Sequence, residues 1–563
     1  MHTQKNVPYA VITYNVFYQT SFEGTDPLTQ ISFFDLQDVV LTLILIANDT
    51  KNRKNSNTHV NETFIHRLPA AKAFRLKRFI SKDGIDNFFL TTPTVIAHII
   101  TDIYKLIPYN KPKFNADHPG FEEMLLDVIL IYNERQYPEV GIGPKINSHD
   151  QIWRIMLMQD ITGVSNVHYA RTANIKHLLF IEFLRGSLGE NFTTVENTFG
   201  KHTRLPSIYT FVLSFINLFV AIENKFKESG SSLIWFDKDT PTYQLLKNFQ
   251  MIHDQNIATD TNFDISFYVT HPFFEHKDGK IYLVDHSHFA FALDKGWIYY
   301  FFKHSKIIDF LPQVNRFADF QSYLGKRYYE EYVILGLLKH LNKPNFRILR
   351  TDDTNLPDAA AIFNEKDVFL FEVKSSALHY KVNADQSASE FQRFIDENYS
   401  SDKKGGIQLF KSIKYLAGDN KHLYKLKHPV GKITVYPIII YTEQHMEKHG
   451  VNDYVNQKFL KIIANYDSPF YDIKPLVMIH YDFFVENAIL LEKYPRLLKD
   501  AIKEYLSFVN RKKATYKKTE HNLDYYKSMV SFDKFIIGFQ KLYTMEQMSI
   551  FKNTARIFKL KGS

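Results

Sequence analysis

The sequence predicts an α/β protein of several domains, because helical and β-like patterns alternate along the chain in long blocks. Apolar residues recur at helical spacing through most of the first 255 residues, and β-like runs replace them at 262–302. Patterns of helix, strand, hairpin, helix and strand follow, before a helical end. A chain of 563 residues is also long enough for roughly three or four domains. The expected domains are a mainly helical recognition or partner region at 1–255, a small β-rich connector at 256–312, an α/β domain at 313–490 and a helical carboxyl-terminal extension at 491–563.

The amino-terminal region is predicted to be helical from segments 150–158, 176–184 and 208–226, whose apolar residues fall at helical spacing. The most apolar runs, 39–47 and 211–222, are shorter than the about 20 residues needed to cross a bilayer. We therefore expect buried helices there and no membrane partner. The chain also begins without the basic-then-apolar layout of a secretory signal, which favours a cytoplasmic location.

Strands are expected where β-branched and aromatic residues gather between turn signals. A turn at 277–280 separates two such runs in the connector. In the later α/β domain, Pro437 lies inside a run that otherwise reads as a buried strand, although proline lacks a donor for a central ladder. The strands expected on this basis are 263–269, 281–284, 433–441 and 476–480.

The segment 357–374 reads as one β-hairpin, with two strand-like runs around a polar Asn-Glu-Lys-Asp turn. Asp358 falls directly opposite Glu372 if the loop has three residues, 364–366. Lys374 then shares a face with Glu372, because side chains alternate along a strand. The charged and apolar faces are expected to separate. The residues expected on the apolar, core-facing side are Phe363, Phe369 and Phe371.

Two carboxylates that converge at a strand end suit Mg²⁺, a hard cation that takes oxygen ligands and keeps waters for a phosphate substrate. A lysine beside them can orient or help to deprotonate the attacking water and can neutralise charge on the scissile phosphate. Asp358, Glu372 and Lys374 together therefore predict a metal-dependent phosphodiesterase. Glu-x-Lys alone would predict little in a chain with 69 Lys+Arg and 61 Asp+Glu.

At these residues the chain resembles the PD-(D/E)XK nuclease superfamily. The family pattern of Pro-Asp, a hairpin spacer and Glu-x-Lys is present as Pro357-Asp358 and Glu372-Val373-Lys374. The resemblance implies a restriction-endonuclease-like α/β/α core that hydrolyses phosphodiester bonds with Mg²⁺ or Mn²⁺. It also implies nucleic acid as the partner, and DNA rather than RNA as the substrate.

The resemblance extends to two flanking helices. In the family a preceding helix commonly supplies a further acid, and 324–333 resembles that helix, with Glu330 preferred to Glu331. A following helix often carries a glutamine or lysine, and Gln408 matches this position. Many relatives serve prokaryotic restriction or antiviral defence, which implies a nuclease effector that a protein sensor activates. The implied catalytic residues are Asp358, Glu372, Lys374, Glu330 and Gln408, and the implied metal ligands are Asp358, Glu372 and Glu330.

Two other functions stay open. The first is a non-catalytic nucleic-acid-binding or scaffold protein that retains a nuclease fold, alone or as an oligomer. The second is a ribonuclease, because Arg171 and His177 fit the loose Arg-spacer-His pattern of helical ribonucleases resembling the HEPN family. There the arginine would stabilise phosphate charge and the histidine would transfer a proton.

The remaining polar patterns predict structural roles. His445 and His449 are one helical turn apart without a third ligand, and we expect them at the surface. The segment 285–288, Asp-His-Ser-His, alternates in an expected strand. The basic run 511–518 is typical of a solvated helix end, with phosphate contact as the alternative.

Composition limits the remaining classes of function. A formal net charge of +8 favours approach to a polyanion. The absence of cysteine excludes disulfides, iron–sulfur clusters and cysteine-ligated zinc. The sequence also contains neither a Gly-x-x-x-x-Gly-Lys-Ser/Thr phosphate loop nor a Gly-x-Ser-x-Gly elbow, which disfavours ATPase and serine-hydrolase activity.

Overall fold

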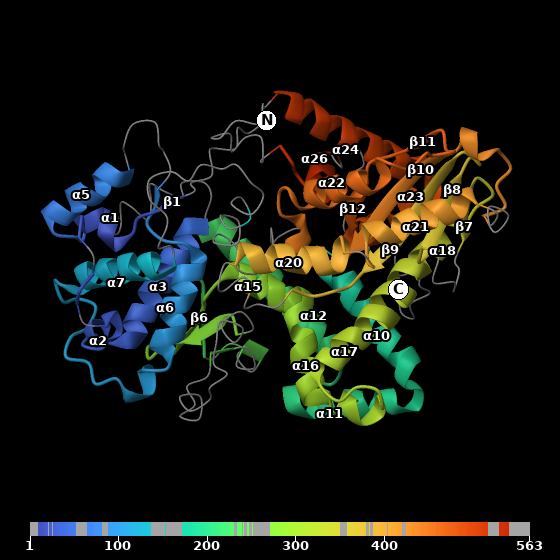
Figure 1. Ribbon diagram of the computed structural model, residues 1–563. Helices are drawn as coiled ribbons and strands as arrows, with labels where there is room; N and C mark the ends of the chain where they lie inside the picture. The colour runs from blue at the N-terminus through green and yellow to red at the C-terminus, as the bar shows by residue number, and fades with distance from the viewer. Residues whose placement is uncertain are drawn as a thin grey trace.

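The protein is a mixed α/β molecule with helices at both ends of the chain, as Figure 1 shows for the computed structural model. A helical unit, coloured blue, lies on one side, and the largest sheet lies on the other. The structure describes residues 10–20, 22–24, 26–51, 65–80, 88–136, 153, 172–229, 233–238, 240, 245–246, 250–251, 271–349, 357–378, 382, 387–401, 403–418, 424–515 and 528–539.

The first helical unit has a core of its own, in which buried aliphatic side chains of α3, α6 and α7 meet. The amide of Asn133 donates to Ile12 O and to Leu90 O, each at 2.7 Å, and so ties the ends of β1 and β2 to α7. Its elements are β1 (Ala10–Val11), α1 (Tyr14–Tyr18), α2 (Pro27–Ile31), α3 (Leu36–Lys51), α5 (Ala70–Ile80), β2 (Phe88–Phe89), α6 (Pro93–Tyr104), η1 (Ile107–Tyr109) and α7 (Phe121–Gln136).

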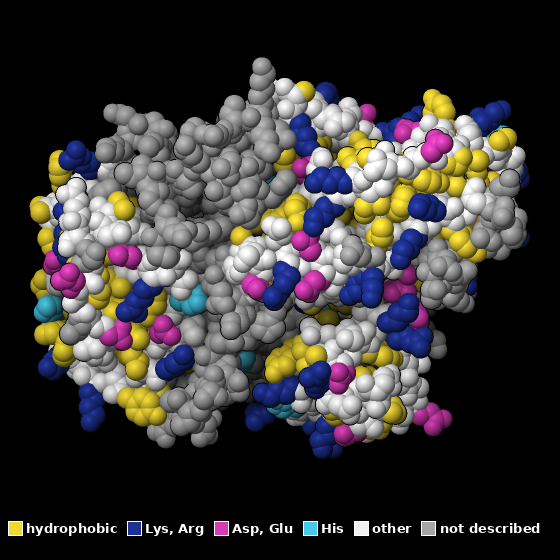
Figure 2. Space-filling view, in the orientation of Figure 1, with side chains coloured by type: hydrophobic (Ala, Val, Ile, Leu, Met, Phe, Trp, Pro, Cys, Tyr) yellow, Lys and Arg dark blue, Asp and Glu magenta, His cyan; other side chains and the backbone are white. Residues whose placement is uncertain are grey.

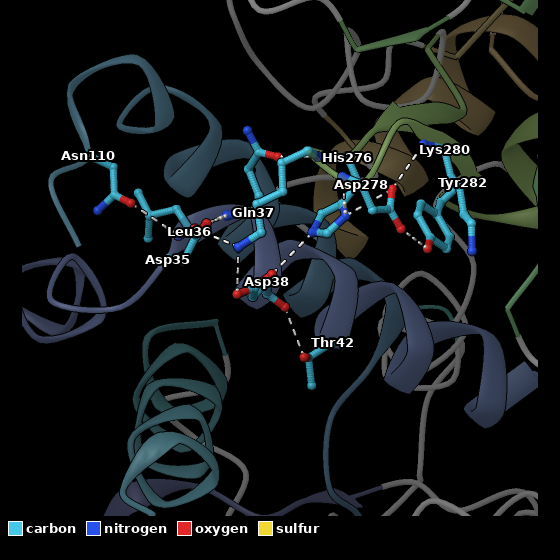
Figure 3. Close-up of polar contacts among 11 residues, drawn as sticks. Asp35, Leu36, Gln37, Asp38, Thr42, Asn110, His276, Asp278, Lys280 and Tyr282 are labelled. Atoms are coloured by element: carbon cyan, nitrogen blue, oxygen red, sulfur yellow. Dashed lines mark hydrogen bonds and ion pairs between the residues drawn. The ribbon is translucent and has the colours of Figure 1, made fainter. Parts of the chain in front are cut away.

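A small four-stranded sheet lies beside this unit, with strand order β3-β6-β5-β4. The expected turn at 277–280 is present, and Gly279 adopts φ +84° within it. Figure 3 shows how this turn is held on α3. Lys277 Nζ lies 2.7 Å from Asp35 Oδ2 and 2.9 Å from Asp38 Oδ2, and His276 Nε2 lies 3.1 Å from Asp38 Oδ1. The strands are β3 (Trp235–Asp237), β4 (Gln250–Met251), β5 (Phe273–Glu275) and β6 (Lys280–Leu283).

A second group of helices packs against the largest sheet and shares its core. The predicted helices at 176–184 and 208–226 are both present, as α10 and α12. By length and composition alone α12 could cross a membrane over Ile208–Lys225, and 39% of that window is buried inside the protein. The group comprises α10 (Ala173–Leu188), η2 (Gly189–Asn191), α11 (Phe192–Thr203), α12 (Ile208–Ser229), α15 (His286–Phe291), η4 (Ala292–Gly296), α16 (Trp297–Ser305), η5 (Ile307–Phe310), α17 (Phe317–Tyr323), η6 (Leu324–Ile334) and α18 (Leu335–His340); η4 and η6 are π-helical.

The largest sheet has six strands. Five follow the order β11-β10-β9-β8-β7, and the sixth, β12, pairs with the later residues of β10 on the same side as β11. Strands β7, β8 and β9 are antiparallel, whereas β9, β10, β11 and β12 run parallel. Helices cover both faces of the sheet. Alternate residues of the strands therefore belong to two separate cores. The strands and following helices are β7 (Phe346–Leu349), β8 (Ala359–Phe363), β9 (Asp367–Lys374), α20 (Ala388–Tyr399), α21 (Gly406–Ala417), η8 (Val430–Lys432), β10 (Thr434–Tyr441), η9 (Gln444–Glu447), α22 (Val451–Ile463), β11 (Asp472–Ile473), β12 (Val477–His480), α23 (Tyr481–Lys493), α24 (Arg496–Thr515) and α26 (Phe532–Phe539).

The predicted hairpin register is confirmed. Ala359 pairs with Phe371 and Phe363 pairs with Asp367, so the loop has the three residues 364–366. Asn364 and Glu365 both adopt left-handed backbone angles, as a tight hairpin turn requires. The expected core-facing phenylalanines, Phe363, Phe369 and Phe371, belong to the same core.

The expected separation into one charged and one apolar face is present at residues 371–374, where Phe371 and Val373 belong to the first core, but it does not extend along the rest of β9. Val368 and Leu370, on the same face as Glu372, are buried in the second core. The reason is that helices cover both faces of the sheet, so each face of an inner strand is apolar along most of its length. On that face only the carboxyl-terminal end of the strand, at Glu372 and Lys374, is polar.

Strand β10 continues through Pro437 without a break, and its neighbours explain why. Residues 434–435 pair with β11 and residues 438–441 pair with β12, so the same side of β10 has no strand partner at 436–437. Val435 O accepts from Lys474 N on that side at 2.9 Å. Pro437 is two residues further on and therefore faces the same side, so its missing N–H falls in the gap between β11 and β12.

The structure corrects one further expectation about secondary structure and leaves two outside its range. The segment 285–288 was expected in a strand, but α15 begins at His286. Asp285 begins this helix, because its carboxylate accepts from His288 N at 3.2 Å. The predicted strand 263–269, and the predicted helix 150–158 apart from Trp153, lie outside the described residues.

Candidate active site

The candidate site lies at the open end of the β8–β9 hairpin. By the observed register, Asp358 comes just before β8 and opposite Glu372 of β9. Asp358 Oδ2 accepts a hydrogen bond from Val373 N at 2.7 Å, which continues the hairpin ladder by one step. The local sequence therefore fixes the acid at the strand end, with one oxygen bound to the backbone.

Lys374 lies between two side-chain acceptors, one from β9 and one from α21. Its Nζ donates to Glu372 Oε1 at 2.6 Å and to Gln408 Oε1 at 2.8 Å. Gln408 belongs to the first turn of α21, and its Oε1 also accepts from Gly405 N at 2.9 Å. Gly405 adopts φ +66°, where a side chain would collide with the Tyr399 carbonyl. The tight turn into α21 thus positions the amide that holds Lys374.

The π-helical segment η6 lies over the end of β9. A Cβ atom on Gly325 would lie 2.5 Å from Ser375 Oγ, so the two segments approach as closely as a glycine allows. Lys326, the next residue, forms an ion pair with Glu330 one turn further on. Burial and the nearby Asp358 carboxylate raise the pKa of Glu330, although Lys326 opposes them. The structure therefore brings Glu330 into the neighbourhood of Asp358.

The electrostatics of Glu372 link all the acids of the site. Its pKa is raised to about 7, mainly by burial; the ammonium of Lys374 lowers it, and the charges of Asp358 and Glu330 contribute to the rise. Glu372 is only 3% exposed. A buried carboxyl with neighbouring acids gains from any cation that enters the site, because each added positive charge favours its ionised form.

The donor set consists of carboxylate oxygens, which suits Mg²⁺ or Mn²⁺. Asp358, Glu372 and Glu330 are the residues that could hold such an ion. Among the described residues, however, no three His, Asp or Glu side chains are close enough together to form a ready group of ligands. Each acid has its own partner instead: Val373 N for Asp358, Lys374 for Glu372 and Lys326 for Glu330.

His177 lies in the protein core. Its Nε2 lies 2.6 Å from Leu293 O, and its ring packs against Trp297. Burial lowers the pKa of this imidazole to about 4. A residue in this setting cannot exchange protons with a phosphate substrate at the surface. Arg171, the other half of the ribonuclease pattern, lies outside the described residues.

Two other sequence patterns can be placed. His445 was expected at the surface, but it is 3% exposed and its Nδ1 lies 2.6 Å from Glu443 Oε1. The expectation is wrong because η9 turns the chain inward directly after β10. Of the basic run 511–518, Arg511–Thr515 form the end of α24, as expected for a helix end, and 516–518 lie outside the described residues.

Sequence reasoning missed a buried charge cluster at the same edge of the sheet. Lys176 forms ion pairs with Asp294 and with Asp482, the latter at 3.0 Å, and all three are almost fully buried. Thr172 Oγ1 donates to Asp482 Oδ2 at 3.1 Å, and Gln444 Nε2 donates to Asp294 Oδ2 at 2.7 Å. One signal was available: Asp482 lies two residues after the end of the apolar strand β12, in the first turn of α23.

Lys326 was missed as well. It precedes Glu330 by four residues, the spacing of an ion pair on a helix face, and this spacing alone carries no functional meaning. Only the packing of Gly325 on Ser375 brings the lysine to the hairpin end. Its position is therefore a consequence of tertiary structure.

With the geometry established, the chain was compared with known proteins. No protein-family model matches it, and no curated protein or solved structure is significantly similar to it.

Proposed function

We propose that this protein is a metal-dependent nuclease with a restriction-endonuclease-like core, which hydrolyses phosphodiester bonds at Asp358, Glu372 and Lys374. The observation that carries the proposal is the pairing of Asp358 opposite Glu372, with Lys374 on the same face and held by Gln408. The sequence pattern that resembles PD-(D/E)XK nucleases requires this register. A different loop length would have separated the residues.

Each side chain has a role that follows from its contacts. Asp358 and Glu372 would hold the metal, with Glu330 as a further acid from η6. A bound Mg²⁺ or Mn²⁺ would supply Lewis-acid polarisation of the phosphate. Lys374 Nζ, held between Glu372 and Gln408, would donate to a phosphate oxygen or orient the attacking water. Gln408 is a positioning residue, because its contact is with Lys374.

The nature of the substrate rests on the resemblance. It favours DNA over RNA, and it favours a prokaryotic restriction or antiviral effector in the cytoplasm that a separate sensor activates. The net charge of +8 is compatible with either nucleic acid. A scaffold role is the main alternative, and it would not require the contacts of Lys374.

Cleavage of linear duplex, supercoiled and single-stranded DNA and of RNA, with Mg²⁺ or Mn²⁺, tests the proposal directly. We expect the wild type to cut and Lys374→Ala and Asp358→Ala to lose cutting while they still bind. Lys366→Ala is the matched control, since this lysine is exposed in the loop at the other end of the same hairpin. EDTA controls for the metal.

Three outcomes would contradict the proposal. Cutting that survives both substitutions would place the chemistry elsewhere. Equal loss in the Lys366→Ala control would indicate a general effect on the hairpin. A biological effect of the protein that persists in Lys374→Ala would favour the scaffold.

A further inference from the structure

Helices α11 and α16 end in the same pattern of residue types. The first ends as Lys201-His202-Thr203-Arg204 and the second as Lys303-His304-Ser305-Lys306. Within each pattern the hydroxyl residue is buried, and both basic residues are exposed. The final basic residue adopts a left-handed backbone in both, with φ +58° at Arg204 and +56° at Lys306.

The two histidines bring the helix ends together. The rings of His202 and His304 stack with their centroids 3.7 Å apart and an interplanar angle of 6°. Tyr300 packs beside both rings, at 4.6 Å from His304 and 5.5 Å from His202. Because each histidine directly follows a lysine and lies two residues before the basic cap, the stack also draws four cations onto one small surface. We call Lys201, Arg204, Lys303 and Lys306 the basic patch.

The histidines add no charge to this patch at neutral pH. Burial and Lys303 lower the pKa of His202. Burial, His202 and Lys303 lower the pKa of His304 to about 4. Two neutral rings stack without repulsion, so they act as the spacer that sets the distance between the helix ends.

The four cations of the basic patch lack a close carboxylate partner within the described part of the protein. No ion pair there involves any of its four cations, whereas Lys277, Arg327 and Arg347 each pair with a carboxylate. The nearby Glu196 carboxylate instead accepts from Ile208 N at 3.3 Å. Figure 2 shows Lys and Arg side chains gathered over α11 and the lower end of α16, at the foot of the view.

Helix stability alone does not account for this arrangement. A cation near a helix carboxyl terminus is favourable, which explains one basic residue in each last turn. The left-handed position that follows the helix, however, favours glycine, because other side chains are sterically disfavoured there. Placing a basic residue at both of these positions, beside a basic last turn, adds like-charge repulsion that an anionic partner would remove.

We propose that the basic patch binds the phosphate backbone of a nucleic acid. Lysine and arginine neutralise phosphates with little regard to sequence, and exposed cations at close spacing suit the regular charges of a nucleic-acid strand. Within the two patterns the surface between the cations is polar, whereas a surface that binds a bilayer places apolar side chains beside its cations. The inference goes beyond the proposed catalysis, because it gives the helical region a binding role that needs no cleavage.

The test measures binding by full-length protein that carries Glu372→Gln, so that nothing is cut. Fluorescence anisotropy follows labelled single-stranded and duplex oligonucleotides over a range of salt concentrations. One variant changes Lys201, Arg204, Lys303 and Lys306 to Gln. The matched control changes four exposed lysines on other elements, Lys111, Lys432, Lys461 and Lys503, to Gln and so removes the same net charge. Circular dichroism melting verifies that both fold.

We expect the basic-patch variant to bind about tenfold or more weakly at physiological salt, with a shallower dependence of affinity on salt, because phosphate contacts are lost. The control variant should stay within about threefold of its parent. Equal loss in both variants would overturn the proposal, since net charge alone would then explain binding. No loss in the basic-patch variant would overturn it too.

A vesicle assay with anionic lipid is the second arm, because α12 exposes Tyr209, Leu213 and Val220 close to the patch in the chain. Binding to vesicles but not to oligonucleotides, abolished in the basic-patch variant, would overturn the proposal in favour of a membrane surface.

The nuclease hypothesis and the basic-patch hypothesis can be contradicted separately. Patch-dependent binding without any cleavage by the wild type contradicts only the nuclease. Cleavage with unchanged binding by the basic-patch variant contradicts only the patch.

Discussion

Lys374 and Lys176 lie at the same edge of the largest sheet, each between two side-chain acceptors, yet their surroundings differ. Lys374 lies between Glu372 and Gln408 at the partly buried open end of a hairpin, and its side chain is 12% exposed. Lys176 lies between Asp294 and Asp482 with 5% of its side chain exposed. Segment η6 separates the two: it pairs Lys326 with Glu330 on one side, and its Tyr328 hydroxyl donates to Lys176 O at 2.8 Å.

The comparison shows that residue types alone do not distinguish a candidate catalytic site from a structural cluster. Burial opposes the charge of Lys176, but Asp294 and Asp482 together raise its pKa, so the lysine is held in its charged form between two buried carboxylates. At the hairpin end three acids likewise face two lysines, but Asp358 and Lys374 are only partly buried, and the pKa of Glu372 is raised to about 7, mainly by burial. Incomplete compensation within reach of solvent is what favours chemistry there.

The largest effect should come from breaking the buried cluster. Lys176→Ala leaves two buried carboxylates without a cation, and we expect the free energy of unfolding to fall by ~3–5 kcal/mol in chemical denaturation. Lys277→Ala is the control, because this lysine also pairs with two acids but is 45% exposed, and it should cost ~1 kcal/mol or less. Similar losses in the two variants would remove the distinction between the clusters.

Lys374→Ala should have the opposite profile. Cleavage should fall by about 10²–10³-fold, the usual effect of removing one group that stabilises transition-state charge. The fold should persist, because Lys374 stands at a strand end and Gln408 keeps its bond to Gly405 N. Single-turnover cleavage and circular dichroism measure the two properties. A loss of stability as large as that expected for Lys176→Ala would make Lys374 a structural residue.

Glu372 gives the comparison a dependence on pH. Its pKa rises from 4.5 to about 7 on folding, mainly through burial. The folded state therefore holds the proton more tightly, so this contribution to stability is complete below about pH 4.5 and is lost as pH rises through about 7. The Glu372→Gln variant has no carboxyl to ionise at this position and so avoids the cost of a buried carboxylate. Its stability relative to the wild type should therefore increase by ~2–3 kcal/mol between about pH 5 and about pH 8 in EDTA. Parallel stability curves would show that Glu372 has no such shift.

The smallest expected effect concerns Lys326. Its ammonium neutralises Glu330 and lies near Asp358, so it competes with any metal for these acids. Lys326→Gln should tighten Mn²⁺ binding by about two- to fivefold, as the loss of an exposed ion pair would. Arg327→Gln is matched to it, since Arg327 pairs with Glu331 at the same spacing and is 57% exposed. Equal changes in both variants, measured by calorimetry without substrate, would argue against direct competition.

The hairpin was predictable because its determinants are local. The three-residue loop and the alternation of side chains fix Asp358 opposite Glu372 without help from the rest of the chain. Gln408 was matched through the family resemblance alone, and the turn into α21, which follows α20, brings it to Lys374. These residues lie within one continuous stretch of sequence.

The other parts depend on distant segments. Asp294 meets Lys176 because η4 packs on α10, and neither pattern reveals the other. The burial of Val368 and Leu370 likewise depends on helices that cover the second face of the sheet. Pro437 was a warning against a central strand, and it is accommodated because two short strands divide one side of β10 between them. Such facts need the tertiary structure.

The sheet edge also has an order of completion. Asp533, in α26, accepts from Tyr441 OH at 2.6 Å and from His480 N at 3.0 Å and 3.1 Å, and so joins the ends of β10 and β12. During synthesis the hairpin leaves the ribosome long before α26 does. The edge of the sheet that carries Lys374 therefore lacks the hydrogen bonds to Asp533 until the chain has grown past residue 533. A nascent chain stalled before that residue should therefore be cleaved by a protease next to β12, and resistance to the protease at that stage would show that the edge closes without α26.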